Sequence, residues 1–333
     1  NRTYVRRGLE LMSEGPRPGV AAILERARSE NGPVTTQTVG YKIAPRLNAA
    51  GRISDATICV ELMTTGDARR AGSIADELER LNSERREIQD QVLEEATAAA
   101  DRQRAEGADI LVVDGEGWHR GVLGIVAGRL SDRHRRPVIA LERDAEGVAR
   151  GSARSIEGVD IVELLGEADE LLGRYGGHAA AAGMTLPAAN IPDLRALLAR
   201  ELDARLPDDE EGLPAPTIAV EDRVKLGSLD HRFVRDLDRL RPFGEGNPEP
   251  VFVCEEIRTQ SARIVGDDHL KVEFSDGTGE LGGIGFSMGE HLEMLDQPIA
   301  AVFVPRWSVF RGRGRLEMHL RGLRPSDNDL FEE

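Results

Sequence analysis

This sequence has few of the residues on which several classes of protein depend. Only two of its 333 residues are cysteine, Cys59 and Cys254, and they lie far apart without partners at metal-ligand spacing. This excludes a disulfide scaffold and a cysteine-ligated zinc site, and it fits a reducing cytoplasm. No apolar run approaches the roughly 20 residues that a membrane helix needs, and the first residues do not form a signal peptide. We therefore expect a cytoplasmic chain with no membrane partner.

Lysine is also scarce. It occurs only at Lys42, Lys225 and Lys271, so arginine supplies nearly all of the 43 basic residues, and 59 acidic residues leave a formal net charge of −16. A globally acidic chain does not have the character of a nonspecific nucleic-acid coat. The excess of arginine suits bidentate contacts to phosphate, but a GC-rich genome is its more frequent cause. High acidity with little lysine also fits a salt-adapted organism. The function must therefore be sought in local clusters rather than in the total charge.

Familiar catalytic motifs are missing as well. The sequence contains no P-loop, no GxSxG motif and no zincin motif. Two-metal phosphoester hydrolysis needs several grouped Asp and His ligands, and the sequence shows no such group. The run Asp267-Asp268-His269 falls at a predicted hairpin turn, and we interpret it as a turn. We expect this chain to bind no metal ion of its own.

The first hundred residues predict helices, at 4–12, 19–29 and 55–63, with a loop or helix start at 42–52. The clearest element is 67–106, where apolar residues recur every three or four positions, Asp67 can cap the start and Gly107 the end. Unbroken, this helix is roughly 60 Å long, so we expect it to bridge two bodies. A two-helix hairpin and a coiled coil with a partner are the alternatives.

From residue 110 onward, strands and helices alternate, which indicates an α/β layer structure. We predict strands at 110–114, 138–142, 147–154 and 183–186, and helices at 121–133, 159–172 and 190–206. An acidic linker at 207–214 and a helical stretch at 226–240 follow. The short strands VFVCEEI, SARIVG, HLKVEF, ELGGIGF, IAAVFVPRW and GRLEMHLRGL come next. Five or six such strands predict a small antiparallel β-barrel, for which the OB-fold is the commonest form.

Three clusters in the first domain combine small residues, cations and tight turns, namely PRLNAAGR (45–52), GSARS (151–155) and GGHAAAAGM (176–184). Guanidinium, amide and hydroxyl groups beside glycines are the ingredients of a phosphate site. Solvated arginines at a helix start and a polar strand end are the alternatives for the first two. A fourth patch, 118–126, follows a strand and opens a helix, where backbone N–H groups favour anions.

The barrel carries its own cations beside aromatic residues. Six arginines between Arg306 and Arg324 stand against one acid, Glu317, and Trp307 and Phe310 lie among them. Cations that follow a phosphate backbone, with aromatic rings on which bases stack, are typical of single-strand binding. We therefore predict that Trp307, Arg311 and Arg313 bind nucleic acid; a solvated hairpin is the alternative.

Together, these clusters resemble the bacterial RecJ family, the single-strand-specific 5′→3′ DNA exonucleases of the DHH phosphoesterase superfamily. The matching stretches cover about residues 1 to 325 and are NRTYVRRGLELM, YKIAPRLNAAGRISDA, LNSERR, GWHRGVLGIVAGRL, RGSARSIEGVD, YGGHAAAAGMTL, RPFGEGNPEPVF and VGDDHLKVEF. Such a set is highly specific.

The resemblance implies an N-terminal DHH domain, a long connecting helix, a DHHA1-type α/β domain and an OB-fold. For this sequence it implies the following parts: the end of the DHH-side core with linker helices (1–65), the connecting helix (66–107), the DHHA1 domain (108–207), an acidic linker with a helical connector (208–249), the OB-fold (250–326) and an acidic tail (327–333). The sequence begins where the DHH domain should end, so we expect the metal-binding half to lie upstream of it.

The resemblance also implies an activity in DNA repair and recombination. Two Mn²⁺ or Mg²⁺ ions in the DHH domain would hydrolyse the phosphodiester, so this chain alone is expected to be inactive. Arg46 and Arg52, with Asn48, would neutralise the scissile phosphate. The 5′-terminal phosphate would be bound by Ser152, Arg154, Gly176, Gly177 and His178.

The implied partner is single-stranded DNA with a 5′ phosphate, bound by a monomer that meets a single-strand-binding protein or a helicase. Two other hypotheses stay open. One is a non-catalytic single-strand-binding or replication-scaffold module, which has no need of a phosphate pocket. The other is an oligoribonuclease-type DHH phosphoesterase, which lacks the long helix and the barrel.

Overall fold

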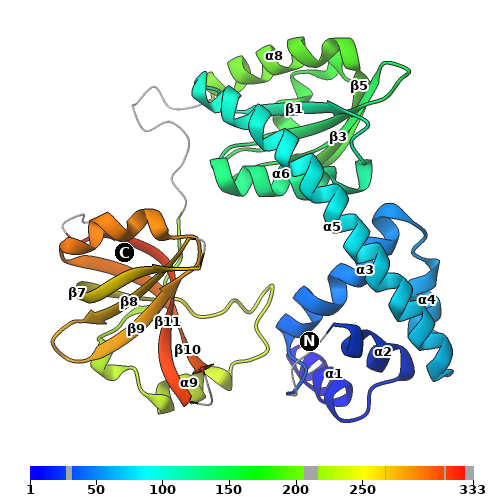
Figure 1. Cartoon of the computed structure of the whole chain (residues 1–333). Coiled ribbons are helices and arrows are strands. Elements are labelled where there is room, and N and C mark those ends of the chain that lie inside the picture. Colours follow the sequence, from blue (N-terminus) through cyan, green and yellow to red (C-terminus); the bar gives the residue numbers. More distant parts are fainter. Residues whose placement is uncertain (28–31, 206–216, 267, 311–312, 327–333) are drawn as a thin grey trace. The chain divides into compact units, whose positions relative to one another are not determined.

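The computed structural model describes residues 1–27, 32–205, 217–266, 268–310 and 313–326 (Figure 1). By its internal contacts the chain forms two units, one of residues 10–216 and one of residues 1–9 with 217–333. No helix in the described ranges combines the length and apolar character needed to span a membrane.

Short helices form the first part of the 10–216 unit. Helix α1 (Arg2–Glu14) enters it from the other unit and is followed by α2 (Pro18–Arg26), a π-helix (Thr38–Ile43), α3 (Ala44–Ile53) and α4 (Thr57–Thr64). The stretch 42–52 is therefore helical: the π-helix ends at Ile43 and α3 follows directly, with Pro45 as its second residue.

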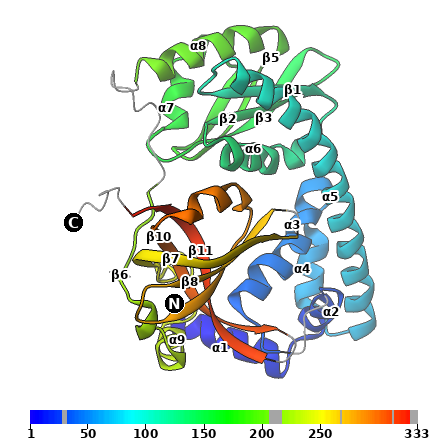
Figure 2. The same cartoon turned by 60° about the vertical axis from the view of Figure 1, so that its left-hand side comes forward.

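Helix α5 (Ala68–Ala105) is a single helix of 38 residues, so the predicted hairpin alternative is wrong. The Asp67 carboxylate caps it by accepting from the backbone N–H groups of Arg69 and Arg70, and Gly107 takes a φ of +89° just beyond its end. Its first half packs into a core with α2 and α3 through Ala71 to Leu81. Its second half packs against the sheet and α6 through Val92 to Ala100 (Figure 2).

The α/β region is built on a sheet with the strand order β1-β2-β3-β5-β4, in which only β1 and β2 are parallel. Its strands are β1 (Leu111–Glu116), β2 (Val138–Arg143), β3 (Val148–Arg154), β4 (Arg174–His178) and β5 (Ala181–Pro187). Helices α5 and α6 (Arg120–His134) cover one face. Helices α7 (Ile161–Gly166) and α8 (Ile191–Asp203) cover the other. The α/β layer prediction is confirmed.

Two elements of this sheet differ from the prediction. Strand β4 contains Gly176 and Gly177, whose low strand propensity hid it in the sequence. The predicted helix at 159–172 is the short α7 followed by a 3₁₀ turn (Asp169–Leu171). A second 3₁₀ turn (Ala188–Asn190) precedes α8.

The other unit is a closed barrel with the strand order β10-β11-β9-β8-β7-β6 and a further pairing between β10 and β7. Its strands are β6 (Asp222–Arg223), β7 (Phe252–Val265), β8 (His269–Ser275), β9 (Glu280–Gly285), β10 (Ile299–Phe310) and β11 (Arg313–Pro325). Its helices are 3₁₀ turns (Leu226–Ser228 and η5, Gly289–Asp296) and α9 (His231–Asp238). The two strands expected at VFVCEEI and SARIVG form the single strand β7, which shifts register between Thr259 and Ser261.

Candidate nucleic-acid interface

Rows of side chains cross the five-stranded sheet, because directly paired residues on neighbouring strands point to the same face. Two rows on the face covered by α5 and α6 are Leu111-Val138-Arg154-Ala181-His178 and Val113-Ala140-Ser152-Gly183-Gly176. On β1 and β2 these residues are apolar and buried under the two helices. From β3 onward they are polar or small and at least partly exposed. We call these six positions the polar shelf: Ser152, Arg154, Gly176, His178, Ala181 and Gly183.

The polar shelf joins two of the predicted clusters, GSARS on β3 and GGHAAAAGM on β4 and β5. A Cβ atom at Gly176 would meet no atom within 4 Å, so open space lies above this position. A Cβ atom at Gly177 would lie 2.2 Å from the carbonyl oxygen of Ala181, so only glycine lets β4 and β5 approach here. A cavity of about 440 Å³ lies beside the shelf and is lined by Arg174, Tyr175, Gly176, Gly183, Met184 and Thr185.

Helix α6 borders the polar shelf with a stripe of three glycines. A Cβ atom at Gly121 would lie 2.1 Å from the carbonyl oxygen of Arg52. One at Gly124 would lie 3.0 Å from Nη2 of Arg154, and one at Gly128 would lie 3.9 Å from Cγ of that residue. Because residues three and four apart share a helix face, the stripe lets α3 and β3 both pack closely against α6.

The exposed face of α3 brings two predicted residues to the start of α6. Arg52 is exposed, and its Nη1 donates to the carbonyl oxygen of Gly121 at 3.0 Å. Asn48 lies one helical turn before it and is also exposed. Both side chains are therefore accessible to a ligand, and Arg52 lies beside the helix that borders the polar shelf.

Arg46 lies on the opposite, buried face of α3, with only 7% of its surface exposed. Its Nε donates to Oε2 of Glu79 at 2.5 Å, and its Nη1 donates to the carbonyl oxygen of Lys42. Internal partners thus already occupy the guanidinium that we expected to face a phosphate. Arg46 lies three and four residues before the buried Ala49 and Ala50, and this helical spacing was the sequence signal that Arg46 is buried with them.

Arg85 of α5 belongs to the motif LNSERR, but its sequence context did not mark it as a site residue. Its Nη1 donates to Oε1 of Gln89 at 2.6 Å, and its Nη2 donates to Oδ1 of Asn82 at 2.8 Å. Burial lowers the pKa of Arg85, and the charges of Arg86, Arg52 and Arg129 lower it further. The spacing of 82, 85 and 89 on one helix face was the available signal.

Arg52, Arg85 and Arg154, which we call the arginine trio, share an unusual environment. Within the described ranges they donate to backbone carbonyls or side-chain amides and form no ion pair with a carboxylate. Other arginines nearby do pair with acids: Arg120 with Glu142 at 2.9 Å, and Arg129 with Asp90 at 3.7 Å. In a chain of net charge −16, three guanidinium groups without an ion pair indicate a place for an anion.

Two side chains of the patch at 118–126 form hydrogen bonds inside the protein. Trp118 is buried and donates from Nε1 to Oε2 of Glu95 at 2.8 Å. The side chain of His119 caps α6 by accepting from the backbone N–H of Gly121 at 3.1 Å. One N–H group of the first turn is therefore already satisfied inside the protein.

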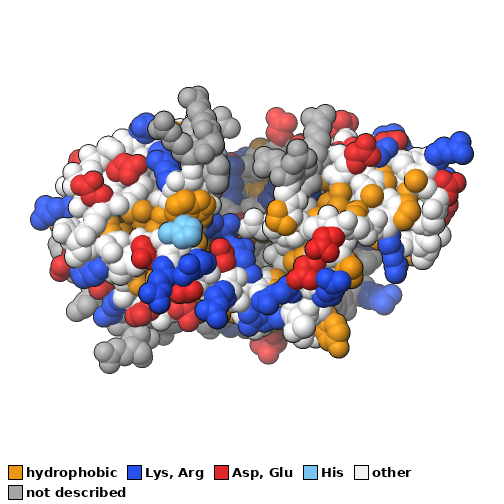
Figure 3. All heavy atoms as spheres, turned by 90° about the horizontal axis from the view of Figure 1, so that it is seen from below, with side chains coloured by type: hydrophobic (Ala, Val, Ile, Leu, Met, Phe, Trp, Pro, Cys, Tyr) orange, Lys and Arg blue, Asp and Glu red, His pale blue; other side chains and the backbone are white. Residues whose placement is uncertain are grey.

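On the barrel, Trp307 is 45% exposed and stands edge-on to His231, with ring centroids 5.0 Å apart. A Cβ atom at Gly314 would lie 2.4 Å from Nε1 of Trp307, so the indole lies over that glycine. Lys and Arg side chains gather beside hydrophobic side chains and a histidine where α9 lies (Figure 3). Arg232 and Arg235 of α9 and Arg239, which follows it, have side chains 79%, 62% and 80% exposed, and each lies within 4.0 Å of the carboxylate of Asp236. Arg311 and the side chain of Arg313 lie outside the described residues.

The remaining barrel arginines are less available than the sequence indicated. Arg306 donates to Glu249 at 2.5 Å, and Arg321 lies 3.8 Å from the same carboxylate. Arg315 donates to Glu317 at 2.8 Å. In the sequence this stretch has one acid, but the fold brings Glu249 to it from another part of the chain.

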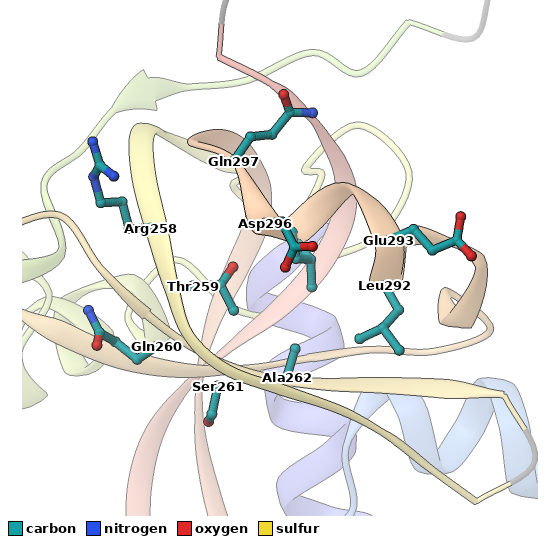
Figure 4. Close-up of a pocket in the computed structure, with 10 residues that line it drawn as sticks. Arg258, Thr259, Gln260, Ser261, Ala262, Leu292, Glu293, Asp296 and Gln297 are labelled. Atoms are coloured by element: carbon teal, nitrogen blue, oxygen red, sulfur yellow. The ribbon is translucent and has the colours of Figure 1, made fainter.

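A second cavity, of about 620 Å³, lies between β7 and η5 (Figure 4). Strand β7 pairs with β10 only as far as Ile257, so the cavity borders an edge of β7 that has no partner strand in the described ranges. Its lining combines Arg258 with Glu293 and Asp296. This mixed charge does not fit a phosphate site.

Known protein families match both the α/β region and the barrel of this chain. A DHHA1 domain model matches residues 107–204, and a RecJ OB domain model matches residues 220–322. The single-stranded-DNA-specific exonuclease RecJ of Bacillus subtilis is 35% identical over an alignment of 337 positions that covers 100% of this chain and 42% of the relative. That of Dickeya dadantii is 31% identical and covers 98% of this chain and 58% of the relative.

This chain belongs to the RecJ family. The crystal structure of RecJ in complex with Mn²⁺ from Thermus thermophilus superimposes with a TM-score of 0.83 at 29% identity and covers 98% of this chain and 47% of that one. The Mg²⁺ complex gives 0.82 at 30% identity. These matches confirm the DHHA1 domain and the OB-fold, and the RecJ-family chain spans about half the length of the relatives that it matches.

The residues of this RecJ-family chain do not fit the two metal ions that the resemblance implies. Within the described ranges, no three His, Cys, Asp or Glu side chains are grouped so that they could hold a metal ion. Asp268 lies at the turn between β7 and β8, and His269 is the first residue of β8. We therefore derive no hydrolytic step from these residues.

Proposed function

We propose that this chain is the DNA-holding part of a RecJ-type 5′→3′ exonuclease that acts on single-stranded DNA in repair and recombination. The observation that carries the proposal is the polar shelf. It places the hydroxyl of Ser152, the guanidinium of Arg154 and the imidazole of His178 on one face of the sheet, with open space at Gly176. Donors of three kinds on one face beside open space suit a terminal phosphate, which carries more charge than a linking phosphate.

In this proposal the shelf sets the polarity of the enzyme. Ser152 and Arg154 bind the 5′-terminal phosphate, His178 donates to it, and the backbone of Gly176 and Gly177 allows its close approach. Arg52, which reaches the start of α6 from α3, neutralises the scissile phosphate, and the amide of Asn48 donates a hydrogen bond to it. Arg46 is left out of this role because Glu79 and Lys42 already occupy its guanidinium.

We place the hydrolytic Mn²⁺ or Mg²⁺ ions outside this chain, in a DHH domain. Support comes from the two Thermus RecJ structures, which are complexes with these metals, and from the lack of a metal-ligand group in the described ranges. By itself the chain then binds a strand without cutting it. Release of nucleotides by this chain in Mn²⁺ would contradict that statement.

The barrel is proposed to guide the strand. The half-exposed indole of Trp307 offers a stacking surface to a base, and the exposed arginines of α9 lie on the same unit. We further propose that the protein acts as a monomer in the cytoplasm and meets a single-strand-binding protein or a helicase on its substrate.

The test compares two oligonucleotides that differ only in a 5′ phosphate or a 5′ hydroxyl group. We expect the wild-type chain to bind the phosphorylated strand about tenfold more tightly by fluorescence anisotropy, since hydrogen bonds to a charged group are worth roughly 1.5–3 kcal/mol and 1.4 kcal/mol is about tenfold. Arg154→Ala should abolish this preference.

Arg200→Ala is the matched control, because Arg200 is an arginine of α8, on the opposite face of the sheet, and is 71% exposed. It should keep the full preference. Equal binding of the two oligonucleotides by the wild-type chain would reject the terminal-phosphate site.

A further inference from the structure

We propose that Arg85, oriented by Asn82 and Gln89 on α5, binds a phosphodiester inside the strand, next to the scissile phosphate that Arg52 of α3 contacts in the proposed function. This second phosphate site is separate from the terminal-phosphate site on the polar shelf. It rests on the proposed function only in taking single-stranded nucleic acid as the ligand.

The two hydrogen bonds of Arg85 hold its guanidinium in place without neutralising it. Asn82 and Gln89 are 0% and 1% exposed, so their amide oxygens are fixed acceptors. They use two of the five N–H donors of the arginine, and the other donors have no hydrogen-bond partner among the described residues. Glu84 lies one residue away but pairs with Arg80 at 2.9 Å. The guanidinium therefore keeps its charge and most of its donors for a ligand.

The amide of Asn82 gives a hydrogen bond to Arg85 priority over a partner for its own NH₂ group. Its Nδ2 is buried and has no hydrogen-bond partner within the described residues. An unsatisfied buried donor costs roughly 1–3 kcal/mol. The amide oxygen nevertheless points toward Arg85 and accepts from its Nη2. In the flipped orientation the NH₂ group would face Nη2, and two donors would then oppose each other.

Like charges gather around this arginine. The positive charges of Arg52, Arg86 and Arg129 act on Arg85, and with its burial they lower its pKa. Asp90 acts in the opposite direction as the smallest contribution, and it also lies 3.7 Å from Arg129. Such a group is repulsive by itself, and a bound phosphate would relieve the repulsion.

The glycine stripe of α6 separates the two phosphate sites. Gly121 contacts Arg52, which belongs with Arg85, while Gly124 and Gly128 face Arg154 of the polar shelf. A strand whose 5′ end lies on the shelf would continue past the start of α6 toward α5. Arg85 is then placed for a linkage downstream of the terminal phosphate.

The experiment uses the full 333-residue chain and oligonucleotides in which one phosphodiester at a time is replaced by a neutral methylphosphonate. We expect a neutral linkage at one position near the 5′ end to weaken wild-type binding about tenfold, the loss of roughly one charged hydrogen bond. In Arg85→Gln the same replacement should have little further effect, because the partner is already gone. If no position shows this non-additivity, Arg85 does not bind a phosphodiester and the proposal is overturned.

Salt dependence and the 5′-phosphate preference separate this proposal from the proposed function. Arg85→Gln should weaken phosphorylated and hydroxyl strands equally and reduce the slope of log K against log salt by about 0.7. The 5′-phosphate preference should survive. Loss of that preference would place Arg85 in the terminal site and overturn the inference, whereas a wild-type chain without any preference would overturn only the terminal site.

Two further variants guard against a trivial loss of folding. Arg80→Gln alters an exposed arginine of the same helix and should leave binding unchanged. Asn82→Asp keeps Arg85 but gives it an internal carboxylate, so it should weaken binding at an unchanged melting temperature or a higher one. Full affinity in Asn82→Asp would contradict the claim that the uncompensated charge of Arg85 matters.

Discussion

Asp276 shows how one side chain ties the barrel to the segment before α9. Its carboxylate accepts from the backbone N–H groups of Leu226, Thr278 and Gly279 and from the hydroxyl of Thr278. Burial opposes ionisation, but these hydrogen bonds outweigh it and lower the pKa of Asp276 from 3.8 to about 2. The charged form is therefore built into this turn.

Asp276→Asn should lower the free energy of unfolding of the barrel at pH 7 by about 2 kcal/mol, since hydrogen bonds to a charged group are worth roughly 1.5–3 kcal/mol. Because the folded-state pKa is depressed, the stabilisation is present above the unfolded value of 3.8 and is lost as the pH falls toward about 2. Denaturant titrations between pH 7 and pH 2 should show a flatter acid limb in the variant. Asp222→Asn, an exposed carboxylate of the same unit, should behave like the wild type; an unchanged acid limb in Asp276→Asn would contradict this prediction.

Arg46 and Arg52 show what spacing reveals about single residues. Both belong to one motif, and helical periodicity alone assigns residues 46, 49 and 50 to one face of α3 and residues 48 and 52 to another. The structure buries the first set and exposes the second. The sequence did not show that Glu79 of α5 would take up the charge of Arg46, because that contact joins residues 33 positions apart.

The glycine stripe of α6 acts at the scale of whole elements, because it sets how closely α3 and β3 approach this helix. The two contacts differ in kind. At Gly121 the obstacle to a side chain is the backbone of Arg52, which cannot rotate away. At Gly124 the nearest atom is the end of the flexible side chain of Arg154.

Gly121→Ala should therefore lower stability by about 1–3 kcal/mol, as overpacking does, and reduce the melting temperature. Gly124→Ala should leave the melting temperature nearly unchanged, because Arg154 can move and alanine favours the helix by about 1 kcal/mol. It should nevertheless weaken the 5′-phosphate preference, because Arg154 moves.

Gly8→Ala on α1 is the control, since a Cβ atom there would meet nothing within 4 Å. Thermal unfolding and the two-oligonucleotide assay read out all three variants. Equal melting temperatures for Gly121→Ala and Gly124→Ala would show that the backbone contact at Gly121 is not rigid.

Strand β4 shows why some elements could not be predicted from the sequence. Its residues RYGGH carry two glycines and no alternation of apolar and polar side chains. The strand exists because β5 pairs with it along its whole length, from Arg174 opposite Thr185 to His178 opposite Ala181. By contrast, α5 was predictable because its caps and its apolar spacing are local signals.

At the scale of the molecule, the two units have separate hydrophobic cores. The barrel core consists of buried residues that fall between positions 226 and 320 of the sequence. It shares no residue with the cores around α5 and the five-stranded sheet. The two tryptophans of the sequence are divided between them, with Trp118 buried beside α6 and Trp307 on the barrel. Each unit therefore has its own fluorescent reporter.

We expect urea to unfold the two units at different midpoints, because each buries its own apolar surface. In Trp118→Phe, the fluorescence of Trp307 should follow the barrel, and in Trp307→Phe, Trp118 should follow the other unit. Adding Asp276→Asn should lower only the midpoint reported by Trp307. Coincident midpoints that shift together would show that the units unfold as one.

The sequence by itself determined the order of the domains, the long helix with its caps, the strands of the barrel and the motifs that carry the RecJ resemblance, because each depends on residues close together along the chain. Only the tertiary structure decided which arginines are neutralised and which are left for a ligand. Glu249 pairs with Arg306 and lies beside Arg321, while Arg52 and Arg85 form no ion pair with a carboxylate among the described residues. The physical reason is that charge compensation depends on distance in space, and residues far apart in the chain set that distance.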